Sequence, residues 1–152
     1  MIKGIENIAG GLAGAAVLNI LHETVKRLDA DAPRVDLVGE EALSKSLESI
    51  GVEPPKGDDL FGATLVADIF SNALYFSAVG TGKKKNLLLL GAGYDLAAGI
   101  GAITLTKPLG LDDRPINRTA KTKALTVAFY LVGGLVSALT IKGLRKKTTR
   151  FI

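Results

Sequence analysis

The chain has 152 residues, a formal net charge of +4, 47% hydrophobic residues and 18 glycines. This length suits one compact domain and excludes a pair of separate cofactor and substrate domains. The absence of cysteine excludes disulfides, thiolate catalysis and iron–sulfur clusters, and a single histidine disfavours a histidine-based metal site.

The first apolar run covers residues 4–21. Three polar residues interrupt it: Glu6, Asn7 and Asn19. A secretory signal peptide has a basic start and small residues after its apolar core, whereas this run has Glu6 near its start and His22 just after its end. The pattern favours a retained helix. We expect it to continue to about Asp31, because Pro33 disfavours helical dihedrals in the residue before it.

Residues 31–59 are polar and acidic, and we expect them to lie outside the membrane. From His22 to Asp59 the chain carries ten acidic and five basic residues, so the positive charge is concentrated elsewhere. Leu43, Leu47 and Ile50 recur at helical spacing and predict a short amphipathic helix, which Gly51 would end. This helix could lie on the membrane or cap the bundle.

The second and third apolar runs, residues 60–80 and 87–106, each contain one aspartate. Their short lysine-rich connection predicts a helical hairpin. One aspartate costs about 3 kcal/mol in a spanning helix, which the surrounding aliphatic residues can offset. The alternative is a soluble helical bundle with two buried aspartates, but its apolar runs would be hard to cover with the remaining polar surface.

The fourth run, residues 124–141, has no charged residue and is followed by five basic residues between Lys142 and Arg150. Basic flanks anchor a spanning helix among anionic lipid headgroups. The sequence therefore predicts an all-α, multi-pass helical bundle with about four transmembrane helices. It would form a single integral membrane domain over residues 1–152 in a cell membrane.

Two further inferences follow from the distribution of lysine and arginine. With four spans, nine of these residues lie on the side of the termini and ten on the other, so the positive-inside rule leaves the orientation undetermined. The basic residues are spread over separate segments, whereas nucleic-acid binding needs them on one surface. We therefore expect lipid and membrane helices as partners, and no nucleic acid.

Small residues four positions apart occur in every run and predict helix–helix contacts. They are Gly10 and Gly14; Ala63, Ala67 and Ser71; Gly93, Ala97 and Gly101; and Gly133 with Ser137 and Gly134 with Ala138. Small side chains let two backbones approach closely in lipid. The contacts could form within the bundle, in a homo-oligomer or in a larger membrane complex. The run at residues 87–106 is small on two sides, so we expect it to be the central helix.

An intramembrane polar site is predicted around the two aspartates. Asp68, Asn72 and Tyr75 recur at positions i, i+4 and i+7, so they share one stripe of a helix. Asp95 lies about as far from the hairpin connection as Asn72, so we expect these two to face each other. The site could belong to a proton or cation path. Alternatively, a carboxyl group hydrogen-bonded to Asn72 or to a tyrosine fixes the hairpin.

A second polar cluster lies where the first helix should leave the bilayer. Asn19, His22 and Glu23 share one face of the helix, and Arg34 follows shortly after. A histidine beside a glutamate could form a proton relay or a ligand pair, but a solvated, ion-paired face is the simpler interpretation. We predict no bound metal and no cofactor.

No catalytic constellation is present, because the dinucleotide-like and phosphate-loop-like patterns near residues 77–96 each lack a required residue. The sequence favours a non-enzymatic accessory or assembly component that binds partner helices through small-residue faces. The alternative is an oligomeric channel or a proton- or cation-coupled transporter that uses Asp68 and Asp95.

Overall fold

The computed structural model describes residues 2–148, and these contain helices and no strand. The elements are α1 (Ile2–Val25), α2 (Val35–Ser49), α3 (Gly57–Ser77), the 3₁₀ turns η1 (Ala78–Thr81) and η2 (Lys84–Asn86), α4 (Leu87–Leu105), α5 (Arg114–Asn117) and α6 (Ala120–Thr148). Four of them, α1, α3, α4 and α6, are long and apolar enough to cross a membrane. The predicted all-α, multi-pass bundle is confirmed. Arg150, the last residue of the predicted basic flank, lies outside the described residues.

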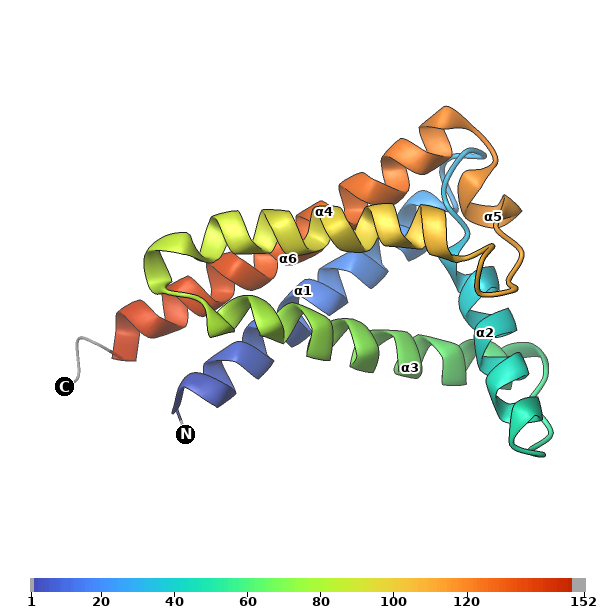
Figure 1. The fold of residues 1–152 in the computed structure, drawn as a ribbon, viewed down its shortest axis with the longest axis horizontal. Helices are drawn as coiled ribbons and strands as arrows, with labels where there is room; N and C mark the ends of the chain where they lie inside the picture. Colours follow the sequence, from blue (N-terminus) through green and yellow to red (C-terminus); the bar gives the residue numbers. More distant parts are fainter. Residues whose placement is uncertain (1, 149–152) are drawn as a thin grey trace.

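The four long helices are arranged in the spatial order α3, α1, α6, α4. Both α1 and α4 pack along α6, and α1 also packs along α3, whereas α3 and α4 touch little beyond their connection. Figure 1 shows the N-terminus, the α3–α4 connection and the end of α6 at one end of the molecule, with α2 and α5 at the other. The central helix is therefore α6, and the expectation that residues 87–106 form the central helix is wrong.

Adjacent glycines explain why α6 takes the central place. A Cβ at Gly14 of α1 would lie 2.5 Å from the carbonyl oxygen of Gly133, and a Cβ at Gly91 of α4 would lie 2.9 Å from that of Gly134. Neighbouring residues of a helix point about 100° apart, since 3.6 residues make one turn. Gly133 and Gly134 therefore let two different helices approach the α6 backbone at the same level.

The first helix ends at Val25, earlier than the predicted end near Asp31. Beyond Val25, the N–H groups of Arg27 and Leu28 bond to carbonyls three residues back, and a carboxylate oxygen of Asp29 accepts the N–H of Asp31 at 2.9 Å. Such tight turns and local side-chain bonds compete with continuation of the helix. They redirect the chain towards α2.

The short amphipathic helix is present as α2, which begins at Val35, before its apolar stripe. Gly51, with φ of 77°, ends the helix as predicted, and its N–H bonds to the carbonyl of Glu48 at 3.0 Å. Figure 1 shows α2 lying across the end of the bundle. The sequence predicted that this helix lies on the membrane or caps the bundle, and the structure shows it capping the bundle.

Hydrogen bonds to the loop before α5 hold α2 in that position. The Lys45 ammonium donates to the carbonyl of Gly110 at 2.6 Å, and the Glu41 carboxylate accepts the N–H of Asp112 at 2.8 Å. The Lys45 ammonium also lies 2.7 Å from a Glu41 carboxylate oxygen, and the hydrogen bonds from Lys45 first and Asp112 second lower the pKa of Glu41. Residues far apart in the sequence thus tie the cap to the connection between α4 and α6.

The apolar run at residues 124–141 lies inside a longer helix, α6. The helix begins at Ala120 because the hydroxyl of Thr119 accepts the N–H of Thr122 at 3.0 Å, which satisfies one of the unpaired donors of the first turn. The hydropathy of the sequence did not predict this first turn of α6, because its residues are polar.

Arg145, near the other end of α6, is one of the basic residues expected among headgroup anchors, but only 11% of its side chain is exposed. Its guanidinium donates to the carbonyl of Gly82 at 3.1 Å, to the Asn7 amide oxygen at 2.9 Å, and to the carbonyl of Gly80. This residue therefore joins α1, α6 and the α3–α4 connection.

Candidate functional site

A small cavity of about 30 Å³, with both polar and apolar side chains on its wall, lies between α1, α2 and α3. Its lining residues are Asn19, His22, Glu23, Val35, Asp36, Gly39, Phe61, Thr64, Leu65 and Asp68. The cavity brings together two clusters that the sequence placed separately, because the α1 residues of the predicted interface cluster meet Asp68 of the predicted intramembrane site. Sequence reasoning missed Asp36 and Thr64. For Thr64 a signal existed, since it lies four residues before Asp68 on the same helix face.

Asp68 forms the inner wall of this cavity. The Asn72 amide donates to one of its carboxylate oxygens at 2.9 Å. The sequence suggested such a bond as a means of fixing the hairpin, but both residues belong to α3, so this bond does not join the two helices. Within the part of the chain that the structure describes, no lysine, arginine or histidine forms an ion pair with Asp68. The Asn19 side chain also hydrogen-bonds to Asp68, so two neutral amides hold the carboxylate and no basic side chain compensates its charge.

Two buried polar side chains on the cavity wall have unused hydrogen-bonding capacity. His22 is 8% exposed and Thr64 is 6% exposed. Neither ring nitrogen of His22 nor the hydroxyl of Thr64 has a hydrogen-bond partner among residues 2–148. The His22 ring packs edge-on against Phe129, with 5.2 Å between ring centroids. Because buried polar groups are nearly always paired, these two groups distinguish the cavity from an ordinary packing gap.

Two acidic residues on the cavity wall, Glu23 and Asp36, form ion pairs. The Lys26 ammonium lies 2.5 Å from a carboxylate oxygen of Glu23 and 3.1 Å from one of Asp36, and the Arg34 guanidinium lies 2.8 Å from the same Asp36 oxygen. Burial acts to raise the pKa of Asp36, but the hydrogen bonds from Arg34 and Lys26 together bring it below its ordinary value. Glu23 and Asp36 are therefore compensated by nearby cations.

Asp95, the other intramembrane aspartate, lies apart from this cavity. It is fully buried where α4 meets α6, and neither carboxylate oxygen has a hydrogen-bond partner among the described residues. The expectation that it faces Asn72 is wrong, because its carboxylate lies against Gly134 of α6. Residues at equal depth on two helices meet only if these helices pack along their length. The helix α4, which carries Asp95, packs along α6 and not along α3, which carries Asn72.

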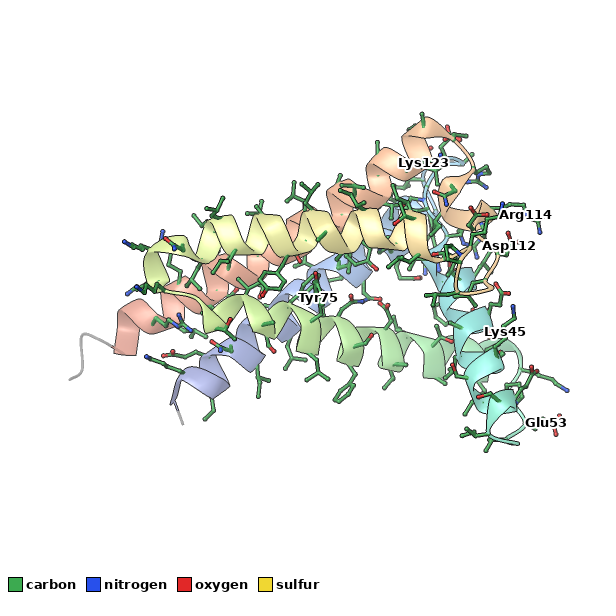
Figure 2. All side chains as sticks on the ribbon, viewed as in Figure 1. Lys45, Glu53, Tyr75, Asp112, Arg114 and Lys123 are labelled. Carbon is green, nitrogen blue, oxygen red and sulfur yellow. The ribbon has the colours of Figure 1, made fainter. Side chains whose placement is uncertain are left out.

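Tyr75 completes the predicted polar stripe but contacts a different helix. Its hydroxyl donates to the carbonyl of Tyr94 on α4 at 2.6 Å, and Figure 2 shows it between α3 and α4. The stripe is thus divided, because Asp68 and Asn72 belong to the cavity side of α3 while Tyr75 links α3 to α4.

The predicted helix-packing residues also fall into two groups. Gly10, Gly14, Gly133 and Ser137 lie inside the bundle: a Cβ at Gly10 would lie 3.0 Å from the carbonyl oxygen of Ser137, whose own hydroxyl donates to the carbonyl of Phe76 on α3 at 3.2 Å. A Cβ at Gly93 would have no neighbour within 4 Å, and one at Gly101 would meet only Leu105 of its own helix. Ala97 between them is exposed.

Among the described residues, no group of three or more histidine, cysteine, aspartate or glutamate side chains is arranged to hold a metal ion. No family model, curated protein or solved structure matches the chain.

Proposed function

We propose that this chain is a non-enzymatic accessory or assembly component of a cell membrane, and that the outer face of α4 binds a helix of a partner membrane protein. The observation that carries the proposal is the distribution of glycines on α4. Gly91 and Gly99 face α6, where a Cβ would lie 2.9 Å from the carbonyl oxygen of Gly134 and 2.8 Å from Cα of Val127. Gly93 and Gly101 face away from the bundle.

Glycine destabilises the interior of a helix by about 1 kcal/mol relative to alanine. At Gly91 and Gly99, close packing on α6 offsets this cost, but no contact within the described chain offsets it at Gly93 and Gly101. A partner backbone on the outer face would supply the missing dispersion contacts, which lipid tails provide less well. Only 22% of the most apolar part of α4 is buried, against 39% for α6, so the face is available.

We further propose that the end of the molecule with the α3–α4 connection lies against anionic lipid headgroups. Lys83, Lys84 and Lys85 are exposed there and form no ion pair within residues 2–148. At the opposite end most cations are paired with acids, as Figure 2 illustrates for Arg114 beside Asp112. Unpaired lysines next to spanning helices are attracted to anionic lipids.

The test of the assembly function uses single cysteines, because the chain has none of its own. An Ala97→Cys variant is cross-linked in native membranes, with Phe70→Cys, which is 65% exposed on α3, as the matched control. We expect Ala97→Cys to give a discrete product with a larger subunit and Phe70→Cys to give none. Adding Gly93→Leu and Gly101→Leu should remove the product, whereas adding Gly62→Leu, where a Cβ also meets nothing, should leave it.

Equal cross-linking at positions 97 and 70 would contradict the assembly function. A product of twice the mass of the chain would instead favour a homo-oligomer. The second candidate function, a channel or a proton- or cation-coupled transporter, is favoured by the cavity at Asp68. Proton or cation flux in liposomes that is lost in Asp68→Asn or Asp95→Asn would replace the assembly function with this one.

A further inference from the structure

We propose that the cavity between α1, α2 and α3 is a binding site for a small monovalent cation of about the size of sodium, held by Asp68. The proposal concerns binding and stands apart from the assembly function of α4. It is carried by three observations: the charge balance of the cavity, its size, and the side chains on its wall.

The charge balance calls for one positive charge. Of the three acidic residues on the wall, Glu23 and Asp36 are paired with Lys26 and Arg34. Asp68 accepts hydrogen bonds from the neutral amides of Asn72 and Asn19, and no basic side chain among the described residues forms an ion pair with it. A carboxylate in a spanning helix without a counter-charge is costly, and a bound cation removes that cost. The charge of this single uncompensated carboxylate is −1, so one monovalent cation neutralises it.

The size of the cavity limits the occupant. A volume of about 30 Å³ holds an ion or one to two water molecules but no organic cation. The wall supplies oxygen atoms suited to a hard cation, from the Asp68 carboxylate, the Thr64 hydroxyl and the Asn19 amide. The unpartnered nitrogens of His22 can hydrogen-bond to a water molecule carried by the ion.

The chemistry of the wall argues against other metals. Calcium takes six to eight oxygen ligands and is bound by several carboxylates, whereas two of the three carboxylates here are held by basic side chains. Transition metals prefer clusters of histidine, cysteine and carboxylate, and the described residues contain no such group. Sodium is therefore the cation that the geometry fits best.

The experiment compares thermal unfolding of the purified, lipid-reconstituted chain in sodium chloride and in choline chloride, at one pH and one ionic strength. Choline is too large for the cavity. A ligand that binds only the folded state raises Tm, and sodium near ten times its Kd should raise it by about 4 °C. Asp68→Asn should abolish this rise in Tm. Thr64→Val should increase about tenfold the sodium concentration that gives half of the full rise in Tm.

Asp95→Asn is the matched control, because it also removes a buried intramembrane carboxylate but lies away from the cavity. It should keep the full sodium effect. Equal Tm values of the unmodified chain in the two salts would overturn the proposal, as would a sodium effect that persists in Asp68→Asn. If Asp68→Asn does not fold, the Thr64→Val titration decides, and an unchanged half-effect concentration overturns the proposal.

Discussion

Gly134 of α6 lies beneath the carboxylate of Asp95 on α4, so closely that a Cβ at this glycine would overlap the carboxylate. Asp95 is fully buried at this point, and neither of its oxygens has a hydrogen-bond partner among the described residues. The contact between α4 and α6 is thus shaped around an acidic side chain that only glycine can accommodate.

We expect Gly134→Ala to destabilise the fold by about 1–3 kcal/mol, because the added methyl group forces α4 away from α6. Shortening the opposing side chain should relieve the overlap, so Asp95→Ala in the Gly134→Ala background should recover much of the loss. The measurement is a double-mutant cycle of unfolding free energies in a mixed micelle. Additive losses from the two substitutions would contradict the proposed contact.

Glycine-to-alanine substitutions should have opposite effects on the two kinds of glycine. A Cβ at Gly14 would lie 2.5 Å from the carbonyl oxygen of Gly133, so Gly14→Ala should separate α1 from α6 and destabilise the fold by about 1–3 kcal/mol. Gly93 has open space, so Gly93→Ala in the isolated chain should stabilise it by about 0.5–1 kcal/mol. Thermal unfolding of the two variants gives the comparison, and shifts of the same sign would contradict this assignment.

Arg145→Gln should destabilise the fold by about 2 kcal/mol, because it removes the charged donor from the carbonyls of Gly80 and Gly82 and from Asn7. Lys142→Gln, at an exposed position one turn earlier, should change the unfolding free energy by less than about 0.5 kcal/mol. Both free energies come from the same denaturation assay. Similar small losses in the two variants would show that Arg145 acts only at the lipid surface.

The ion pairs of Asp36 should give a specific acid dependence of stability. Although burial opposes ionisation, the hydrogen bonds from Arg34 and Lys26 leave the pKa of Asp36 below the ordinary value of 3.8 in the folded chain. Ionised Asp36 therefore stabilises the fold above pH 3.8, and this contribution is lost as the pH falls through the lower, folded pKa.

The check is the difference in Tm between the unmodified chain and Asp36→Asn. This difference should be constant from about pH 7 to about pH 5 and should shrink below about pH 4. Taking a difference cancels the contributions of other acids whose pKa is lowered, such as Asp29 and Glu41. A difference that is the same at about pH 3 and at pH 7 would refute the role of Asp36.

Several features of the fold follow from the sequence because their causes are local. The apolar run at residues 124–141 predicts a helix, because a helix satisfies its own backbone hydrogen bonds and needs no distant partner. Gly51 ends α2 through its own positive φ. The end of α1 is harder to predict, because two residues favour different ends. Pro33 disfavours helix near Asp31, whereas the carboxylate of Asp29 accepts the N–H of Asp31 and favours an earlier end.

The candidate site depended on tertiary packing. Helical spacing placed Asn19, His22 and Glu23 on one face and Asp68 with Asn72 on another, but no local rule indicates that these faces meet. They meet because α1 packs along α3 and because Asp36 of α2 closes the cavity from the side.

The sequence by itself therefore determined the number of apolar helices, their approximate ends and the positions of their polar and small residues, since these depend on neighbours within a few turns. Only the tertiary structure decided that α6 is central, that Asp68 and Asp95 are separated, and that Gly93 and Gly101 face outwards. The physical reason is that two adjacent glycines, Gly133 and Gly134, let α1 and α4 both approach α6. Close packing between backbones is a property of pairs of helices, and a single helix does not reveal which of its small faces will find a partner.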